Sequence, residues 1–186
     1  MKRRITFFII ACAMALPGFA QQQHSDRLDD LLRLTPTAAT FALRLAGVEG
    51  SRPWQQGLAG KCISWGLTIG TVYGLKHTVN ETRPDGSDRH SFPSGHAAIA
   101  FAGARSLDKE YRHVSPWISV AGYGVATFVA VDRVAKDRHH WYDVCAGAAI
   151  GLAATEVGYW LGDRLIKNDH VAIGFSGNRI DLALSW

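Results

Sequence analysis

The alternation of apolar and polar residues predicts a chain built mainly from helices. Between residues 26 and 46, leucines and other apolar residues recur at helical spacing and are interrupted at Thr35-Pro36. This pattern predicts two short helices, the second capped by Thr35 or Thr37. Longer apolar stretches follow at Trp54–Leu75, Ser94–Lys109, Ser115–Val131 and Trp141–Leu165. The sequence therefore predicts an all-α fold, a compact bundle of about five to six helices.

Two segments depart from the helical pattern. Residues 76–92 are polar and rich in turn-forming residues, which predicts a surface loop. From Val171 to Trp186 the period changes to two, because Ile180, Leu182 and Leu184 alternate with other residues. With a turn at 176–178, this pattern predicts a short C-terminal β-hairpin.

The first 20 residues have the pattern of a secretory signal peptide. A basic start at 1–4 is followed by an apolar run at 5–16 and by small residues at Gly18 and Ala20. We expect cleavage after Ala20, which leaves 21–186 as a single domain. An uncleaved membrane anchor and a lipoprotein signal with Cys12 as the lipidated residue are the alternatives. All three interpretations predict export from the cytoplasm.

Composition excludes disorder and gives no sign of a nucleic-acid partner. Hydrophobic residues make up 47% of the chain and charged residues 19%, as in a globular protein. The formal net charge is +4, but Lys2, Arg3 and Arg4 lie in the predicted signal, so the mature chain is nearly neutral. Outside that signal the cysteines are Cys62 and Cys145, for which we expect buried thiols or one disulfide.

The apolar stretches leave the relation to a membrane open. A spanning helix needs about 20 apolar residues, and Ser115–Val131 is the cleanest uncharged run. Elsewhere charged residues interrupt the pattern, and each would cost about 2.5 to 3.5 kcal/mol at mid-bilayer. These residues are Lys61, Arg105, Asp108 and Glu156. With a mean hydropathy of −0.01, the sequence favours a periplasmic protein that is soluble or rests on a membrane, with an integral protein as the alternative.

Three charged clusters carry the candidate chemistry. They are Lys76 with Arg83-Pro84, then Pro93-Ser94-Gly95-His96, then Arg133 with His139 and Asp143. Guanidinium groups and an ammonium group suit the oxygens of a phosphate. The Ser94-Gly95 turn opens a predicted helix, whose free N–H groups favour an anion. Together the clusters predict a phosphate-binding site.

The two histidines supply groups that could break a phosphate ester. His139 and Asp143 are four residues apart, so on a helix they would share one face. The carboxylate would then orient His139 as a nucleophile, with His96 as the general acid. This scheme requires no metal and no cofactor. We predict that His77, His90, His113 and His140 are non-catalytic.

The order and spacing of these motifs resemble the type 2 phosphatidic acid phosphatase and vanadium haloperoxidase superfamily, from about residue 54 to 165. The resemblance implies that Lys76, Arg83, Ser94, Gly95 and Arg133 bind phosphate. It also implies that His96 is the general acid and that Asp143 orients His139, the nucleophile. The family usually has Ser before the last arginine, where this chain has Asp132. That carboxylate would either weaken anion binding or hold Arg133 in place.

The resemblance implies a metal-independent phosphatase for phosphate monoesters or pyrophosphates, acting through a phosphohistidine. Lipid substrates are expected, among them phosphatidic acid, phosphatidylglycerol phosphate, isoprenyl pyrophosphate and lipid A, with contact to a membrane surface. A soluble acid phosphatase acting on small phosphate esters is the alternative. A vanadium-dependent haloperoxidase and a non-catalytic phosphate-binding envelope protein rank below these. A binding protein would need neither His139 nor His96.

Overall fold

The computed structural model describes residues 30–167, 171–176 and 179–184. The signal peptide predicted for 1–20 lies outside these ranges. Of the first short helix predicted after residue 26, only the part from residue 30 is described, and residues 30–32 are helical.

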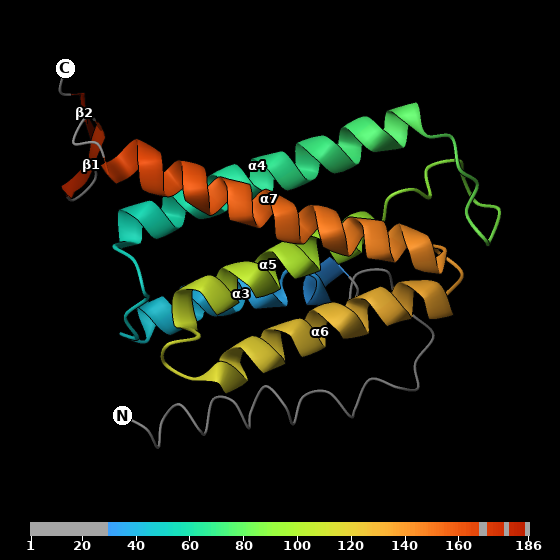
Figure 1. Cartoon of the computed structure of the whole chain (residues 1–186), viewed down its shortest axis with the longest axis horizontal. Helices are drawn as coiled ribbons and strands as arrows, with labels where there is room; N and C mark the ends of the chain where they lie inside the picture. The colour runs from blue at the N-terminus through green and yellow to red at the C-terminus, as the bar shows by residue number, and fades with distance from the viewer. Residues whose placement is uncertain (1–29, 168–170, 177–178, 185–186) are drawn as a thin grey trace.

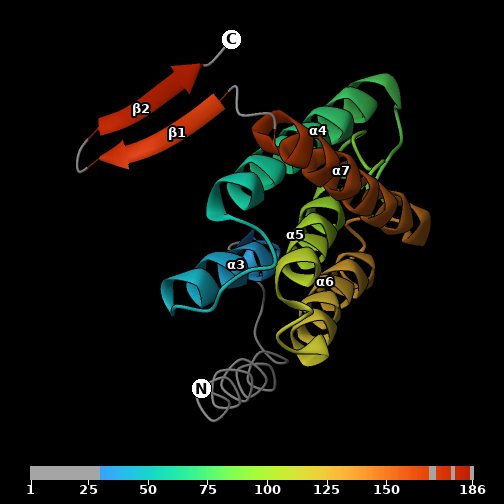
Figure 2. The same ribbon diagram turned by 60° about the vertical axis from the view of Figure 1, so that its left-hand side comes forward.

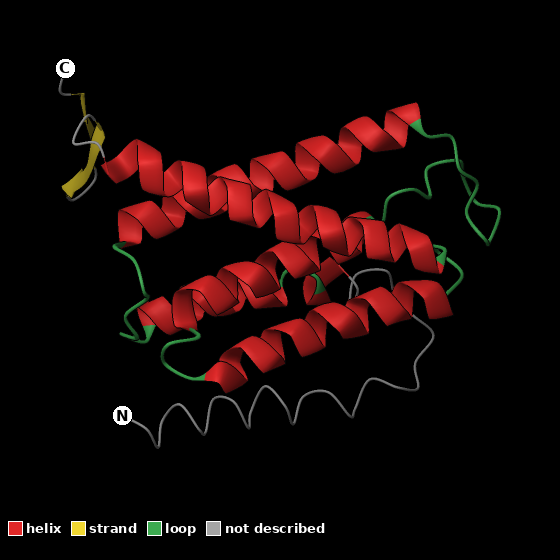
Figure 3. Cartoon of the chain, in the orientation of Figure 1, coloured by secondary structure: helices red, strands yellow, loops and turns green. Residues whose placement is uncertain are grey.

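Five named helices make up most of the described chain. They are α3 (Thr35–Leu45), α4 (Trp54–Thr78), α5 (Gly95–Tyr111), α6 (Pro116–Ala135) and α7 (Trp141–Lys167). Figure 3 shows how helix predominates over strand and loop. The predicted all-α bundle is confirmed. Two helices run more than two residues past their predicted ends. Helix α6 continues for four residues beyond Val131, and α4 continues for about one turn into the predicted loop, so Lys76 lies on the helix.

The starts of the helices show which residues set their boundaries. Ser94 caps α5, and its side chain accepts a hydrogen bond from the N–H of Ala97. The predicted threonine cap of α3 is wrong, because Leu34 occupies the capping position and makes no side-chain cap. The Thr35 hydroxyl donates instead to the carbonyl of Leu31. Pro36 in the first turn needs no N–H partner and fixes the start of α3.

Helix α5 lies at the centre of the bundle, with α3, α6 and α7 packed around it (Figure 1). Helix α4 runs beside α7 and also contacts α5. Alanines dominate the buried face of α5, including Ala97, Ala98 and Ala104, so neighbouring helices approach closely. A Cβ atom added at Gly147 of α7 would lie only 2.3 Å from the carbonyl oxygen of Ser94. Helix α7 therefore presses against the start of α5, where the second motif lies.

A two-stranded hairpin follows α7 and stands apart from the bundle in Figure 2. Strands β1 (Val171–Ser176) and β2 (Arg179–Leu184) are antiparallel, and Val171 pairs with Leu184. The residues predicted for the tip of its turn, 177–178, lie outside the described residues.

The outer faces of α6 and α7 are apolar. Both helices are long and apolar enough to cross a membrane, and only 39% of the apolar window of α6 and 33% of that of α7 are buried. The exposed large apolar side chains on these helices are Trp117, Val120, Phe128 and Val131 on α6, and Trp141, Val157, Trp160 and Leu165 on α7. Exposed apolar side chains on helices of this length are typical of a surface that contacts a membrane or another protein.

The two cysteines behave differently from the prediction. Cys62 and Cys145 are both free and both exposed. Each lies on an outward-facing position of its helix, so the expectations of buried thiols and of a disulfide are wrong for the described structure.

Candidate active site

The three motifs meet at one end of the bundle. The end of α4, the start of α5 and the turn between α6 and α7 surround a cavity of about 370 Å³. Six predicted site residues line it: Lys76, Arg83, Gly95, His96, Arg133 and His139. Segments more than 60 residues apart in the sequence therefore form one cationic cavity.

Lys76 and Arg83 are held by the loop between α4 and α5. The Lys76 ammonium donates to the carbonyl oxygen of His90 at 2.6 Å. The Nε of Arg83 donates to Asp88 at 2.9 Å, and its Nη1 donates to the carbonyl oxygen of Arg138 at 3.4 Å. These contacts fix the cations before any anion arrives, which reduces the entropy lost on binding.

Ser94 and Gly95 have different positions relative to the cavity. Gly95 lines it, whereas Ser94 is fully buried and uses its hydroxyl to cap α5. The N–H of Ser94 donates to the carbonyl oxygen of Asp143 at 3.0 Å, which ties the second motif to the third. The start of α5, at the positive end of the helix dipole, thus lies against the cavity, a position that favours an anion.

His139 and Asp143 lie close together, but not in the predicted way. His139 precedes α7, which begins at Trp141, so the two residues do not share a helical face. The Nδ1 of His139 lies 3.6 Å from the Oδ2 of Asp143, an ion-pair distance that is too long for a hydrogen bond. That oxygen accepts from the Ser91 hydroxyl at 2.5 Å and from the N–H of His140 at 2.9 Å. Asp143 is thus anchored by Ser91, a residue that no sequence pattern marked.

The environment of His139 favours a neutral imidazole. Burial, together with the charges of Arg83 and Lys76, lowers the pKa of His139 to about 3. Asp143 opposes this shift without reversing it. At neutral pH, His139 therefore has an unprotonated nitrogen that can act as a nucleophile.

His96 contacts two residues that the sequence analysis missed. Its Nε2 lies 3.1 Å from the Oδ1 of Asp30 and 3.5 Å from the Nη1 of Arg33. Asp30 and Arg33 form an ion pair at 3.0 Å, and both line the cavity. Burial lowers the pKa of His96 to about 4, with the charges of Arg133 and Arg33 as further causes. Since more than 60 residues separate Arg33 from His96, no local spacing predicts this contact.

Two more charged residues adjoin the third motif. Arg138 lines the cavity and forms an ion pair with Asp85 at 3.2 Å. Asp132, the departure from the family pattern, forms an ion pair with Lys136 one turn further along α6, at 2.7 Å. That pair satisfies the Asp132 carboxylate beside Arg133, so its charge is compensated at the edge of the site.

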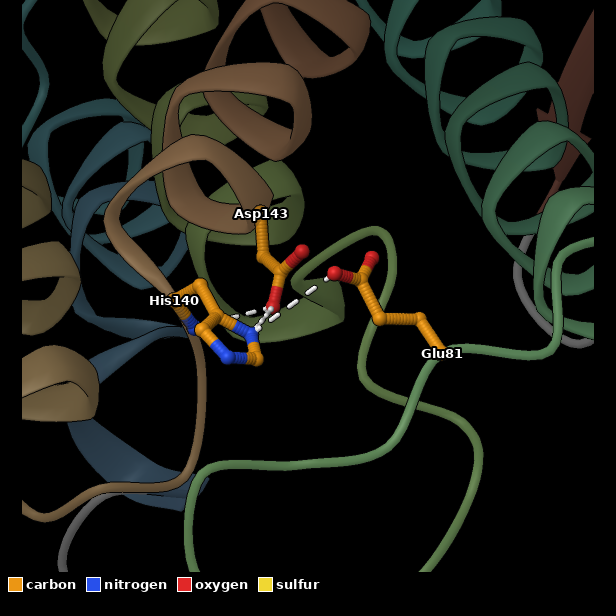
Figure 4. A group of neighbouring side chains, drawn as sticks. All are labelled: Glu81, His140 and Asp143. Carbon is orange, nitrogen blue, oxygen red and sulfur yellow. Dashed lines mark hydrogen bonds and ion pairs between the residues drawn. The ribbon is translucent and has the colours of Figure 1, made fainter.

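The other histidines of the described chain do not line the cavity, and their non-catalytic role stays a prediction. His77 packs against Tyr73, and His113 is exposed. His140 differs, because its Nδ1 lies 3.5 Å from Asp143 and 3.8 Å from Glu81. Figure 4 shows these three side chains converging. They are also a group within the described residues that could hold a metal ion.

Comparisons with known proteins point to a family of phosphatases. Residues 57–167 match the model of the PAP2 superfamily. The chain is 38% identical over 143 residues to a lipid A 1-phosphatase of Porphyromonas gingivalis, covering 76% of this chain and 32% of that protein. It is 36% identical over 80 residues to lipid phosphate phosphatase 2 of Arabidopsis thaliana, covering 37% of this chain and 28% of that protein. The chain thus spans about a third or less of the length of these relatives.

A solved structure has the same fold. The crystal structure of LpxE from Aquifex aeolicus superposes with a TM-score of 0.54 at 21% sequence identity, covering 75% of this chain and 87% of that one. The family match covers more than half of the chain and contains all three motifs. The chain belongs to the PAP2 superfamily.

Proposed function

We propose that this protein is a metal-independent phosphatase that hydrolyses monoesters or pyrophosphates of lipids through a phosphohistidine on His139. The observation that carries the proposal is the cavity itself, in which two histidines with lowered pKa values lie among cations. Lys76, Arg83 and Arg133 bind the phosphate oxygens, and Gly95 allows the backbone to approach them. Perturbed titratable groups in one cationic cavity are typical of a catalytic site.

In the first step, neutral His139 attacks phosphorus and the bond to the leaving oxygen breaks. The fixed cations stabilise the charge on the transferring phosphoryl group. His139 becomes positively charged as the N–P bond forms, and the Asp143 carboxylate 3.6 Å away stabilises that charge. The contact between them should shorten on substrate binding, as catalytic contacts commonly do.

His96 gives a proton to the leaving oxygen and later removes one from the water that hydrolyses the phosphohistidine. Its pKa of about 4 describes the protein without substrate, in which Arg133 and Arg33 repel a proton. A bound phosphate dianion neutralises those cations and raises the pKa of His96 towards its usual value. Substrate binding therefore prepares the acid form that the first step requires.

The lipid part of the proposal rests on the surface of the bundle and on the relatives. The relatives include a lipid A 1-phosphatase and a lipid phosphate phosphatase. Helix α6 has 20 residues, so it spans about 30 Å, the thickness of the hydrocarbon core of a bilayer. We place α6 and α7 in a membrane, with the cavity at its periplasmic surface.

The charges that argued against an integral protein all form ion pairs, of which Lys61–Glu110 is buried and Arg105–Glu156 is partly exposed. Lys61 contacts Glu110 at 2.5 Å, and Arg105 contacts Asp108 and Glu156 at 2.5 Å. Pairing of this kind is how charged groups are tolerated at membrane depth. Resistance to alkaline carbonate extraction supports the membrane placement, whereas release into the supernatant overturns it.

Phosphate release tests the reaction. Purified protein with a chelator is given phosphatidic acid, phosphatidylglycerol phosphate, isoprenyl pyrophosphate, lipid A and a small soluble ester. We expect turnover of at least one lipid and a loss of at least about 100-fold in His139→Ala and His96→Ala. His113→Ala, at an exposed histidine outside the cavity, is the matched control. Full activity in both active-site variants overturns the mechanism, and turnover of the soluble ester alone overturns the lipid assignment.

A further inference from the structure

Glu81, His140 and Asp143 form a group of possible ligands beside the phosphate cavity (Figure 4). We propose that this group is an inhibitory binding site for a divalent transition metal, of which zinc is the best match. Glu81 comes from the loop after α4, Asp143 from the first turn of α7, and His140 from the residue just before that helix. The proposed reaction needs neither Glu81 nor His140, so the site is separate from the catalytic residues except for Asp143.

The distances between the ligand atoms fit a tetrahedral ion. The Nδ1 of His140 lies 3.5 Å from the Oδ2 of Asp143 and 3.8 Å from the Oε1 of Glu81. One ligand atom from each residue lies within 4.8 Å of the others. Zinc binds nitrogen and oxygen at about 2.0 to 2.2 Å, which places the corners of a tetrahedron about 3.3 to 3.6 Å apart. Movements of a few tenths of an ångström to about 1.5 Å bring the three atoms onto one ion.

Two buried atoms in this group have no hydrogen-bond partner among the described residues. They are the Nδ1 of His140 and the Oδ1 of Asp143. Asp143 is completely buried, and an unsatisfied buried carboxylate oxygen costs free energy. A metal ion bound by the Nδ1 of His140 and by both oxygens of the Asp143 carboxylate would give both atoms a partner, and it would compensate the two neighbouring carboxylate charges.

Hydrogen bonds from neighbouring groups already hold these three side chains in place. In known metal sites, hydrogen bonds of this kind orient the residues that bind the ion. The hydroxyl of Tyr142 donates to Oε1 of Glu81. The Ser91 hydroxyl and the N–H of His140 donate to Asp143. The side chains of Glu81 and His140 are 25% and 32% exposed, so an ion can enter from solvent. One imidazole with two carboxylates suits zinc better than magnesium or calcium, which prefer all-oxygen ligands.

Inhibition follows from the position of Asp143. Its Oδ2 lies 3.6 Å from His139 and 3.5 Å from His140, so a single carboxylate serves both histidines. A metal bound between His140 and Glu81 withdraws that negative charge from His139. The positive charge that develops on His139 during attack then loses its stabilisation. The metal is therefore an inhibitor and not a cofactor, and this part of the inference rests on the proposed function.

Metal binding is measured first, independently of activity. The full chain carries three cysteines, which are replaced by serine (Cys12, Cys62 and Cys145) so that thiolates cannot bind the probe. Zinc is titrated by calorimetry, and cobalt by its visible absorption. We expect Glu81→Gln and His140→Ala to weaken binding at least tenfold, and His113→Ala to leave it unchanged. Unchanged affinity in both variants overturns the site.

Inhibition is then measured with the same variants. We expect zinc to inhibit phosphate release at the concentration at which it binds, and a chelator to restore the rate. Glu81→Gln and His140→Ala should keep most of the uninhibited rate and raise the half-inhibitory concentration by the factor found for binding. Zinc that binds without inhibiting overturns the regulatory role. If no phosphate is released under any condition, the proposed function fails, while the binding titration still decides the metal site.

Discussion

Replacing Gly147 with alanine tests how α7 positions the phosphate-binding turn. An added Cβ at Gly147 would lie 2.3 Å from the carbonyl oxygen of Ser94 and 3.2 Å from its carbonyl carbon. An ordinary carbon–oxygen contact is about 3.3 Å, so the backbone at Ser94 must move by about 1 Å. Flexible side chains cannot absorb this movement, because the nearest atoms belong to the backbone.

Two effects of Gly147→Ala follow from a shift of that size. Overpacking typically costs about 1 to 3 kcal/mol, which for a chain of this length lowers Tm by about 2 to 12 °C. Misplacing Gly95 and His96 by about 1 Å should lower kcat/KM about 100-fold. Both are measured in detergent, by thermal unfolding and by phosphate release from the best lipid substrate.

Gly66→Ala on α4 is the matched control. A Cβ at Gly66 meets no atom within 4 Å, and alanine is a better helix former by about 1 kcal/mol. This variant should keep the wild-type rate and unfold at the same or a slightly higher temperature. If Gly147→Ala behaves like Gly66→Ala in both measurements, then close packing of α7 against Ser94 does not position the site.

Two further predictions concern buried charges. Lys61→Met leaves the carboxylate of Glu110, which is 3% exposed, without its cation. This variant should lower the free energy of unfolding by about 3 to 5 kcal/mol. The double variant that adds Glu110→Gln should recover part of that loss, as measured by thermal unfolding. In the folded protein, the pKa values of His96 and His139 are lowered to about 4 and about 3. Below about pH 6.5 these two histidines are protonated in the unfolded chain but remain neutral in the folded protein. The free energy of unfolding should therefore fall as the pH falls from 7 towards 4. A double variant with glutamine at both positions should lose stability less steeply over that range, and an equal slope would contradict the pKa values.

Long apolar helices were predictable because their pattern is local. The ends of α5 and α7 lie within two residues of the predicted positions, whereas α6 runs four residues past its predicted end, to Ala135. The end of α4 was missed because Lys76 and Thr78 are polar, although polar residues on an exposed last turn do not end a helix. The Thr78 hydroxyl even donates to the carbonyl oxygens of Gly74 and Leu75 within that turn.

The composition of the site was predictable only in part. The spacing of the motifs correctly predicted that Lys76 and His96 lie in one site. It also predicted that His139 and Asp143 are close, but on the wrong basis that both lie on one face of a helix. The start of α7 at Trp141 makes that contact a feature of the turn before the helix. Asp30 escaped prediction because it reaches His96 from a segment 66 residues away. Contacts of that kind depend on how the helices pack, which no local spacing encodes.

The identity of the phosphorylated residue tests the proposed mechanism most directly. Protein is mixed with a lipid substrate carrying labelled phosphate in the presence of a chelator, quenched in base within milliseconds, and mapped by mass spectrometry. The mechanism predicts a phosphohistidine at His139 that forms and decays at the rate of turnover and is absent from His139→Ala. Phosphate on His140 instead, or normal turnover by His139→Ala, would contradict it.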